Sequence, residues 1–451
     1  MKNLKNKKIS IIGINDTGVS AALMVKSLGG TVFISDKKDK SELKEKMTIL
    51  ESNSIPYETG GNTEKIIENA DLIIRSFGVP AKIPILDTAR KRNVPIFDEM
   101  KFASLFCKVP TIAITGSNGK TTTIGILKLI FQETGKKVFI AGHNGIPLSS
   151  VILNISRGDI ILLEISCFYL ENSNLFKPSV AFITNITPDH LNRYKGFDKY
   201  SQIKMKLLSY QDESDYCVVN LDDSFAEKII LNNKAKKVFI SAKRFLDGGI
   251  CIDGNEIFIG NKALCGLDEL NIKNTIFYPN ILGAIAIALI SNVPFRDIKR
   301  GICKFGGIEH RFEYLGKIEG VNIVNDSKGT NITATLNAVV NCKAPLILIL
   351  GGINKGLSFR PLINIIKEKV KNVYIYGENK MLLREALNGK VSICELSSLK
   401  EAVEKALAAA RSGDTILFSP ASSAIDSQFK TSEESGRYFK GLLKGKVRLI
   451  V

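Results

Sequence analysis

The chain has 451 residues and a formal net charge of +17, from 62 lysines and arginines against 45 acidic residues. This length predicts two to four domains, and a hydrophobic content of 45% is enough to build buried cores. The longest apolar run, Ile281–Ile290, is about half of the ~20 residues that a membrane-spanning helix needs, so we expect no integral membrane segment. The positive charge is spread along the chain without a basic tail, which suits anionic small ligands at least as well as nucleic acid.

Two features of the chain bear on its cellular location: the N-terminus and the cysteines. The basic start, Met1–Lys8, precedes an apolar stretch, Ile9–Ile14, that is too short for the core of a signal peptide. The eight cysteines are scattered and form no C-x-x-C pair, which favours reduced thiols over disulfides or a structural metal site. We therefore expect a cytoplasmic protein.

The first third of the chain alternates strand and helix patterns. Three apolar runs predict buried strands at Ile9–Ile14, Thr31–Ser35 and Asp71–Ser76, and a helix is expected over Thr17–Leu28. A short connector, Phe106–Pro110, then leads into a new strand. We place the first domain at residues 1–109.

The same alternation continues to the C-terminus, which is typical of parallel α/β sheets. Tight-turn residues between Gly248 and Gly260 also predict a β-hairpin. The other expected elements are strands at Thr111–Thr115, Val138–Ala141, Asp159–Ile165, Ser179–Ile183, Asn322–Asn325, Pro345–Leu350, Asn372–Tyr376 and Thr415–Phe418, and helices after Gly119, at Phe197–Ser209 and at Ser398–Ala410. We expect an α/β protein of three domains: 1–109, 110–310 and 311–451.

A glycine-rich turn after the strand at Thr111–Thr115 is the most informative motif. The sequence Gly116-Ser-Asn-Gly-Lys-Thr-Thr122 opens a predicted helix, so its backbone N–H groups and the helix N-terminus can hold phosphate oxygens. Lys120 would reach the β- and γ-phosphates, and the hydroxyl of Thr121 would bind Mg²⁺. Ile114 replaces the first glycine of the strict phosphate-loop pattern. The motif predicts ATP binding in a P-loop-type α/β domain.

A second glycine turn, Gly13–Gly18, follows the first strand and opens a helix, with Asp36 at the end of the next strand. This resembles a dinucleotide-binding fingerprint, except that Asn15 replaces the middle glycine that lets a pyrophosphate approach the backbone. Two readings stay open from these residues: a Rossmann-like domain that binds a nucleotide diphosphate, or one that is purely structural.

Two further side chains in the middle third stand at predicted strand ends. Glu164 closes the strand at Asp159–Ile165, and a carboxylate at that edge near a phosphate loop is well placed for a metal. His190 follows the next strand and shares this edge, which favours a functional role over a structural one. Lys204 lies on a predicted helix, and nothing local distinguishes it from a solvated lysine.

Taken in chain order, these motifs resemble the Mur ligase superfamily, the ATP-dependent amino-acid ligases of peptidoglycan precursor synthesis and cell-wall growth. The resemblance covers essentially the whole chain and rests on Gly116–Thr122, Glu164–Ser166, Asn185–His190, His310–Glu313, Asn325–Asn331, Gly351–Lys355 and Ser419–Lys430. Within the superfamily, the Asn325–Asn331 motif is similar to that of the branch that joins D-glutamate to UDP-N-acetylmuramoyl-L-alanine through an acyl phosphate and a tetrahedral intermediate.

The resemblance implies a Rossmann-like N-terminal domain for the UDP-sugar, a central domain for ATP and two Mg²⁺ ions, and a Rossmann-like C-terminal domain for the amino acid. It implies catalytic roles for Lys120, His190 and Lys204, with Lys204 carbamylated by CO₂. The metal ligands would be Thr121, Glu164, His190 and the Lys204 carbamate. ATP would contact Gly116, Ser117, Asn118, Gly119, Lys120, Thr121, Thr122, Asn280, Arg311 and Asp326.

For the other two substrates, the resemblance implies UDP-sugar contacts at Thr17, Lys37, Lys38, Ser76 and Asn144. It implies D-glutamate contacts at Lys328, Thr330, Lys355 and Ser423. Three positions depart from the family pattern: Phe277, Asn354 and Ala424. We expect a monomer with small-molecule substrates and no nucleic-acid partner. The alternatives are a sister ligase with another amino acid, or a folylpolyglutamate-type ligase, and, from a different class, a phosphate-loop switch protein.

Overall fold

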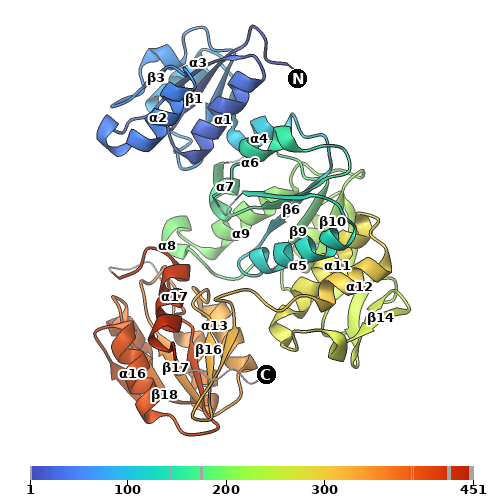
Figure 1. Ribbon diagram of the computed structural model, residues 1–451, viewed down its shortest axis with the longest axis vertical. Coiled ribbons are helices and arrows are strands. Elements are labelled where there is room, and N and C mark those ends of the chain that lie inside the picture. The colour runs from blue at the N-terminus through green and yellow to red at the C-terminus, as the bar shows by residue number, and fades with distance from the viewer. Residues whose placement is uncertain are drawn as a thin grey trace.

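The chain forms three α/β units in sequence order, each built on its own sheet (Figure 1). The computed structural model describes residues 3–142, 145–172, 176–387, 389, 391–423 and 428–445. Within these residues, no helix is both long and apolar enough to cross a membrane.

The N-terminal unit is a five-stranded sheet in the order β3-β2-β1-β4-β5, with every neighbouring pair parallel. Its strands are β1 (Lys8–Ile12), β2 (Thr31–Ser35), β3 (Tyr57–Glu58), β4 (Leu72–Arg75) and β5 (Ile96–Asp98). Its helices are α1 (Asp16–Ser27), α2 (Lys44–Ser52), α3 (Pro84–Lys91) and α4 (Glu99–Ser104). The predicted strands and helix of this part are confirmed to within two residues.

The central unit is a nine-stranded sheet in the order β14-β13-β12-β11-β10-β9-β6-β8-β7. Strands β6 to β12 pair in parallel, and β12–β13–β14 form an antiparallel meander that contains the predicted hairpin. The strands are β6 (Thr111–Thr115), β7 (Val138–Gly142), β8 (Ile160–Glu164), β9 (Val180–Ile183), β10 (Tyr216–Asn220), β11 (Lys236–Ser241), β12 (Ile250–Asp253), β13 (Glu256–Ile259) and β14 (Lys262–Gly266).

The helices of the central unit cover this sheet. They are α5 (Lys120–Glu133), α6 (Leu148–Val151), α7 (Cys167–Asn172), α8 (Leu191–Tyr194), α9 (Phe197–Met205), α10 (Ala226–Leu231), α11 (Tyr278–Ile290) and α12 (Phe295–Cys303). Residues Ile281–Ala288 of α11 are buried, so the longest apolar run of the chain is a core helix. Helix α5, which begins at the phosphate loop, packs against α11 and α12 and is thereby held rigidly on the sheet.

The C-terminal unit is a six-stranded sheet in the order β15-β16-β20-β17-β18-β19. Its strands are β15 (Glu313–Ile318), β16 (Val321–Asn325), β17 (Leu346–Leu350), β18 (Val370–Ile375), β19 (Ile393–Glu395) and β20 (Thr415–Phe418). Its helices are α13 (Ile332–Asn341), α14 (Ile363–Lys369), α15 (Lys380–Leu387), α16 (Leu399–Ala409) and α17 (Ser432–Leu442). The antiparallel edge strand β15 was not expected, because its sequence, Glu-Tyr-Leu-Gly-Lys-Ile, shows no continuous apolar run.

Candidate active site

Three neighbouring parallel strands bring the predicted residues to one edge of the central sheet. Strand β6 lies between β8 and β9, so the carboxyl ends of all three meet there. The phosphate loop leaves β6 at Gly116, Glu164 is the last residue of β8, and the segment that carries His190 follows β9. The order of the strands therefore confirms the shared edge that the sequence predicted.

The phosphate loop has the backbone shape that only glycine adopts easily. Gly116 and Gly119 have φ values of +145° and +90°. A Cβ at Gly116 would lie 1.9 Å from Thr184 Oγ1, and one at Gly119 would lie 2.3 Å from Asn280 Nδ2. Asn280 donates from Nδ2 to Gly119 O at 3.2 Å and to Thr123 Oγ1 at 3.1 Å. In this structure Asn280, predicted as an ATP contact, supports the loop from the side.

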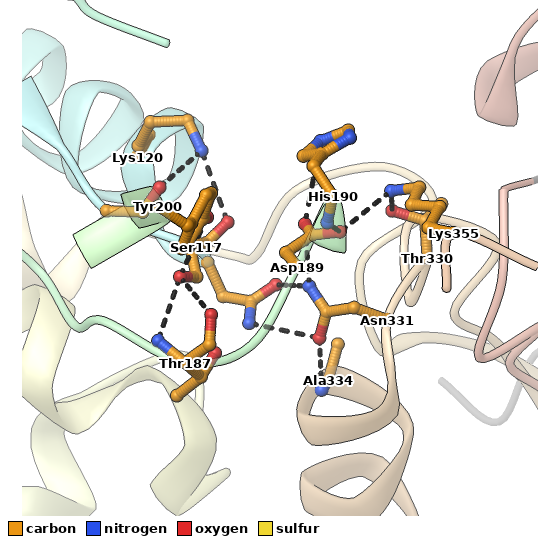
Figure 2. A network of polar contacts seen from close by, with 12 residues as sticks. Ser117, Lys120, Thr187, Asp189, His190, Tyr200, Thr330, Asn331, Ala334 and Lys355 are labelled. Carbon is orange, nitrogen blue, oxygen red and sulfur yellow. Dashed lines mark hydrogen bonds and ion pairs between the residues drawn. The ribbon is translucent and has the colours of Figure 1, made fainter. Parts of the chain in front are cut away.

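Side chains from the segment after β9 hold the loop from its other side. Asn118 N donates to Asn185 Oδ1 at 3.0 Å, and Asn185 Nδ2 returns a bond to Asn118 O at 3.1 Å. Ser117 Oγ donates to Thr187 O at 2.8 Å and lies 3.0 Å from Tyr200 OH, as Figure 2 shows. The loop is thus preorganised by direct hydrogen bonds before any phosphate arrives.

Two lysines converge on one carbonyl of this loop. Lys120 Nζ donates to Gly116 O at 2.9 Å, and Lys204 Nζ donates to the same oxygen at 2.8 Å. Lys204 is only 1% exposed, although its local sequence did not distinguish it from a solvated lysine. Burial, and then the nearby Lys120 ammonium, lower the pKa of Lys204 to about 7. Burial also lowers the pKa of Lys120.

A buried carboxylate lies beside the first helical turn after the loop. Glu164 is 1% exposed, and Thr121 Oγ1 donates to its carboxylate at 3.1 Å from either oxygen. The structure thus buries this carboxylate at the strand end where the sequence predicts a metal ligand. A carboxylate and a hydroxyl beside a phosphate loop are the protein oxygens that Mg²⁺ takes in nucleotide sites. Among the residues that the structure describes, no group of three His, Cys, Asp or Glu side chains could hold a metal alone.

His190 stands at the same edge in a strained backbone conformation, with φ +53°. Its ring meets the ring of Phe168 edge-on, with centroids 5.0 Å apart. Burial lowers the pKa of His190 to about 4, against the opposing influence of Asp189, so the imidazole is neutral at pH 7. A neutral imidazole has a lone pair free for a metal or a proton.

Asp189, one residue earlier, connects the central unit to the C-terminal unit (Figure 2). Its carboxylate accepts a bond from Lys355 Nζ at 3.2 Å and one from Asn331 Nδ2 at 3.3 Å. Asn331 also exchanges bonds with the side chain of Asn118 in the phosphate loop, at 3.1 and 3.3 Å. Burial acts to raise the pKa of Asp189, but the Lys355 ammonium, the neighbouring His190 and the hydrogen bonds from Lys355 and Asn331 together outweigh it, and the pKa is lowered.

The other residues predicted in the C-terminal unit lie around this joint. Thr330 Oγ1 is 3.5 Å from Lys355 Nζ, and Lys328 Nζ is 3.1 Å from a carboxylate oxygen of Glu433 on α17. Ser423 forms a β-bridge with Ile353 through two backbone bonds of 2.9 Å. Asp326 is buried and accepts from Phe312 N at 3.0 Å and from Ser419 Oγ at 2.8 Å. Predicted position Ala424 lies outside the described residues.

A cavity of about 690 Å³ opens between the central and C-terminal units next to the phosphate loop. Asn118, Gly119 and Thr122 line it from the loop, Asn280 and Phe277 from the start of α11, and Arg311 from the linker. Arg311, which is predicted to contact ATP, lines this cavity together with the phosphate-loop residues, whereas Asp326, the other predicted contact, is not among the lining residues. The size suits a mononucleotide.

A second cavity, of about 600 Å³, lies in the N-terminal unit over the glycine turn. Its lining includes Gly13, Asn15, Lys37 and Lys38, so both predicted lysines face it. Asp36 accepts from Ile14 N at 2.7 Å and from Lys38 N at 2.9 Å, which shapes the turn. The predicted positions Thr17 and Ser76 are buried beside the turn, and Asn144 lies outside the described residues.

Three residues of this network were missed as site residues from the sequence: Asp189, Tyr200 and Asn331. Asp189 and Asn331 lie within the motifs Asn185–His190 and Asn325–Asn331, next to His190 and Thr330. Their position beside candidate residues was the available signal. The contact of Tyr200 with Ser117 depends on how α9 folds back onto the loop, for which the local sequence holds no signal.

Three family models match successive parts of the chain. They describe a MurD-like Mur ligase N-terminal domain (residues 7–98), a Mur ligase middle domain (114–249) and a Mur ligase, glutamate ligase domain (310–422). The chain is 38% identical over 448 residues to the UDP-N-acetylmuramoylalanine–D-glutamate ligase of Thermoanaerobacter pseudethanolicus, covering 97% of this chain and 98% of the relative. It is 35% identical to the enzyme of that name from Alkaliphilus metalliredigens, covering 98% of each.

Solved structures share the three-unit architecture at lower identity. A pseudomurein peptide ligase type C from Methanothermus fervidus aligns with a TM-score of 0.62 and 21% identity, over 97% of this chain and 99% of that one. The MurF ligase of Thermotoga maritima in complex with ADP aligns with a TM-score of 0.60 and 17% identity, over 98% and 99%. At these identities the likeness shows the fold.

Burial of the Asp326 carboxylate should lower the free energy of unfolding by a measurable amount. Burial raises the pKa of Asp326 to about 6, against the opposing effect of Arg311. An acid with a raised folded-state pKa destabilises the protein progressively as the pH rises from the unfolded value to the folded one. Asp326→Asn keeps the acceptor for Phe312 N, so it should raise the free energy of unfolding by roughly 1–3 kcal/mol at pH 7.5, with the gain vanishing near pH 4. Denaturant titration at several pH values measures this.

The matched control is Asp414→Asn. The Asp414 carboxylate pairs with Lys371, whose attraction, against the effect of burial, lowers the pKa of Asp414. Its removal should therefore destabilise the protein at pH 7.5. An Asp326→Asn variant that is no more stable than the parent at pH 7.5 would contradict the account of Asp326.

Proposed function

Because the chain belongs to the Mur ligase family, we propose that it is the ATP-dependent ligase that joins D-glutamate to UDP-N-acetylmuramoyl-L-alanine in peptidoglycan precursor synthesis. The observation that carries the proposal is the joint at which Asp189 bonds to Lys355 and Asn331 while Asn331 bonds to the phosphate loop. This joint brings the residues proposed for ATP and for the amino acid to one point, as an amide-forming ligase requires.

The reaction needs activation because a carboxylate is a poor electrophile. A carboxylate oxygen of the L-alanyl group attacks the γ-phosphorus of ATP, ADP leaves, and an acyl phosphate forms. The amine of D-glutamate then attacks the acyl carbon and loses a proton, and the tetrahedral intermediate expels inorganic phosphate to leave the amide. Both steps gather negative charge at one place, so preorganised cations and N–H donors stabilise them.

The phosphate loop would hold ATP through the backbone of Gly116, Ser117, Asn118 and Gly119, with Lys120 on the γ-phosphate. Thr121 and Thr122 open α5, whose N-terminus favours anions. Arg311 lines the same cavity and would bind the nucleotide from the linker, and Asn280 keeps Gly119 in place. We retain Asp326 as a proposed nucleotide contact, although it is buried in the C-terminal unit.

Magnesium fits the donors at this edge. Thr121 and Glu164 would hold one ion, and His190 with a carbamate on Lys204 would help hold a second. Bound Mg²⁺ supplies charge neutralisation for the phosphoryl oxygens. The neutral state of His190 at pH 7 leaves its ring nitrogens able to act as ligands.

The chemistry of Lys204 supports its proposed carbamylation. Only an uncharged amine attacks CO₂, giving a carbamate and a proton, and an ordinary lysine is almost fully protonated at pH 7. With its pKa lowered to about 7, a substantial fraction of Lys204 is uncharged at that pH. The product replaces a positive charge beside Lys120 by a negative one, which removes the like-charge repulsion between the two lysines.

The remaining substrates would bind on the outer units. The UDP-sugar would lie in the N-terminal cavity near Thr17, Lys37, Lys38 and Ser76, with Asn144 contributing from the central unit. D-Glutamate would be held by Lys328, Thr330, Lys355 and Ser423. We further propose that the protein acts as a monomer in the cytoplasm. The three proposed ligands, ATP, the UDP-sugar and D-glutamate, are all anions, which matches the positive charge found in every part of the chain.

Phosphate release distinguishes this ligase from its sisters. With ATP, Mg²⁺ and UDP-N-acetylmuramoyl-L-alanine, the protein should release phosphate at a rate that depends on D-glutamate. L-alanine, L-glutamate and a diamino acid should each give less than about a hundredth of that rate. None of them can put its carboxylates in the proposed D-glutamate site and at the same time direct its amine at the acyl carbon. Release that is independent of D-glutamate would exclude the assignment, and release with a different amino acid would favour a sister ligase.

Single substitutions of the two converging lysines test their separate roles. Lys120→Ala and Lys204→Ala should each lower kcat by at least about a hundredfold, because the first removes the proposed cation on the γ-phosphate and the second removes the proposed carbamate ligand of a Mg²⁺ ion. Lys128→Ala on the exposed side of α5 is the matched control and should retain full activity. Activity that survives Lys204→Ala would rule out the carbamate role, and an electron-density map of the parent at Lys204 would show whether the group is present.

A further inference from the structure

An aromatic stack joins the N-terminal unit to the central unit beside the proposed UDP-sugar cavity. The ring of Phe77, in the turn after β4, lies on the ring of Tyr169, in α7, with centroids 4.2 Å apart and planes 21° from parallel. The hydroxyl of Tyr169 is also a hydrogen-bonding neighbour of Thr17 in the first turn of α1. One side chain of the central unit therefore touches two segments that border the cavity.

On the N-terminal side, the Phe77 turn and the glycine turn form one rigid piece. Asn15 Nδ2 donates to Phe77 O at 2.7 Å and to Ser76 Oγ at 3.2 Å. A Cβ at Gly13 would lie 2.0 Å from Ser76 Oγ, so the two turns are in direct contact. Gly13, Asn15 and Phe77 all line the cavity. A contact that holds the Phe77 ring in place therefore also holds the two turns that line the cavity.

On the central side, α7 is tied to the catalytic edge of the sheet. It follows β8, which ends at Glu164, and Tyr169 N donates to Ser166 Oγ at 3.4 Å. The neighbouring residue Phe168 meets the His190 ring edge-on and lies beneath the guanidinium of Arg193, 5.1 Å from it. Tyr169 and Phe168, which are consecutive on one short helix, thus contact the turn that carries Phe77 and the segment that carries His190. Figure 1 shows α7 on the part of the central unit nearest the N-terminal unit.

The stack belongs to a wider contact between the two units, in which α1, α4 and α6 share a hydrophobic core and Tyr169 packs against that core. The stack extends this contact to the Phe77 turn, and a wider contact restricts rocking of one unit on the other. The space beside the stack is a cavity of only about 20 Å³, lined by Arg75, Glu99 and both stacked rings. The two rings therefore stand next to room for about one water molecule.

We propose that Tyr169 is a positioning residue that, through its stack on Phe77, sets the orientation of the UDP-sugar cavity relative to the phosphate loop. The inference rests on the proposed function, because it matters only for a substrate that is held in the N-terminal unit and reacts at the central one. A small error in that orientation misplaces the reacting carboxylate, and misplacement by about 1 Å can cost on the order of a hundredfold in rate.

The test compares Tyr169→Ala, Phe77→Ala and the double variant with the parent. Each should lower kcat/KM for UDP-N-acetylmuramoyl-L-alanine by about tenfold or more, and the double variant should lose no more than either single one, because both remove the same contact. The KM values for ATP and D-glutamate should change by less than about threefold, since those sites do not touch the stack. Tyr169→Phe, which keeps the ring, should retain most of the activity of the parent.

Two measurements separate positioning from a general loss of structure or of the cavity. The Kd of UDP alone, which needs only the N-terminal unit, should stay within about twofold of the parent for Tyr169→Ala. Small-angle X-ray scattering should show a larger radius of gyration for Tyr169→Ala than for the parent. Phe245→Ala, which breaks an edge-to-face aromatic pair with Phe258 within the central unit, should leave all these values unchanged.

The outcomes distinguish this inference from the proposed function. If the parent and Phe245→Ala are active ligases but Tyr169→Ala matches them in kcat/KM and in scattering, the positioning role is wrong while the function stands. If Tyr169→Ala loses UDP binding to the same extent as activity, the residue forms the cavity and does not orient it, and the proposal is again wrong. A parent without D-glutamate-dependent activity would overturn the proposed function itself.

Discussion

Two buried ammonium groups that share one backbone carbonyl impose the main constraint on this protein. Lys120 and Lys204 both donate to Gly116 O, within 3 Å of it. Burying like charges together is unfavourable unless anions balance them. The phosphoryl oxygens of the proposed ATP and the proposed carbamate on Lys204 would supply such anions. The buried carboxylate of Glu164 offsets part of this positive charge, since it acts to raise the pKa of Lys120 against the effect of burial.

The fold delivers that arrangement through the order of its strands. Strands β8, β6 and β9 are neighbours although other elements separate them in sequence, so Glu164, the loop and His190 meet without long excursions. Asp189 then connects this edge to the C-terminal unit, where Lys355 and Asn331 donate hydrogen bonds to its carboxylate. At the opposite side, α7 extends the edge toward the N-terminal unit. One sheet edge thus connects all three units, and each connection depends on a few polar or aromatic contacts.

The sequence predicted those features that are encoded locally. Apolar runs bounded by glycines identified most of the strands and the phosphate loop, and the end of β8 identified Glu164, because parallel strands place such residues at one edge. The sequence did not reveal the burial of Lys204, which results from α9 packing its side chain toward Gly116, or the bridging role of Asp189, whose partners lie over 140 residues away. Strand β15 was missed because an edge strand needs no continuous apolar run. Long-range packing decided each of these cases.

The most direct test of the central constraint is the pKa of Lys204 in the ligand-free protein. Lysines labelled with ¹³C at Cε can be followed by NMR as the pH changes in buffer depleted of CO₂, with Lys204→Gln to assign the signal. The account predicts one resonance that titrates with a midpoint of about 7 and is absent from the variant. A Lys204 resonance that titrates near the usual lysine value of about 10.4 would contradict it, because the buried repulsion on which the account depends would then be absent.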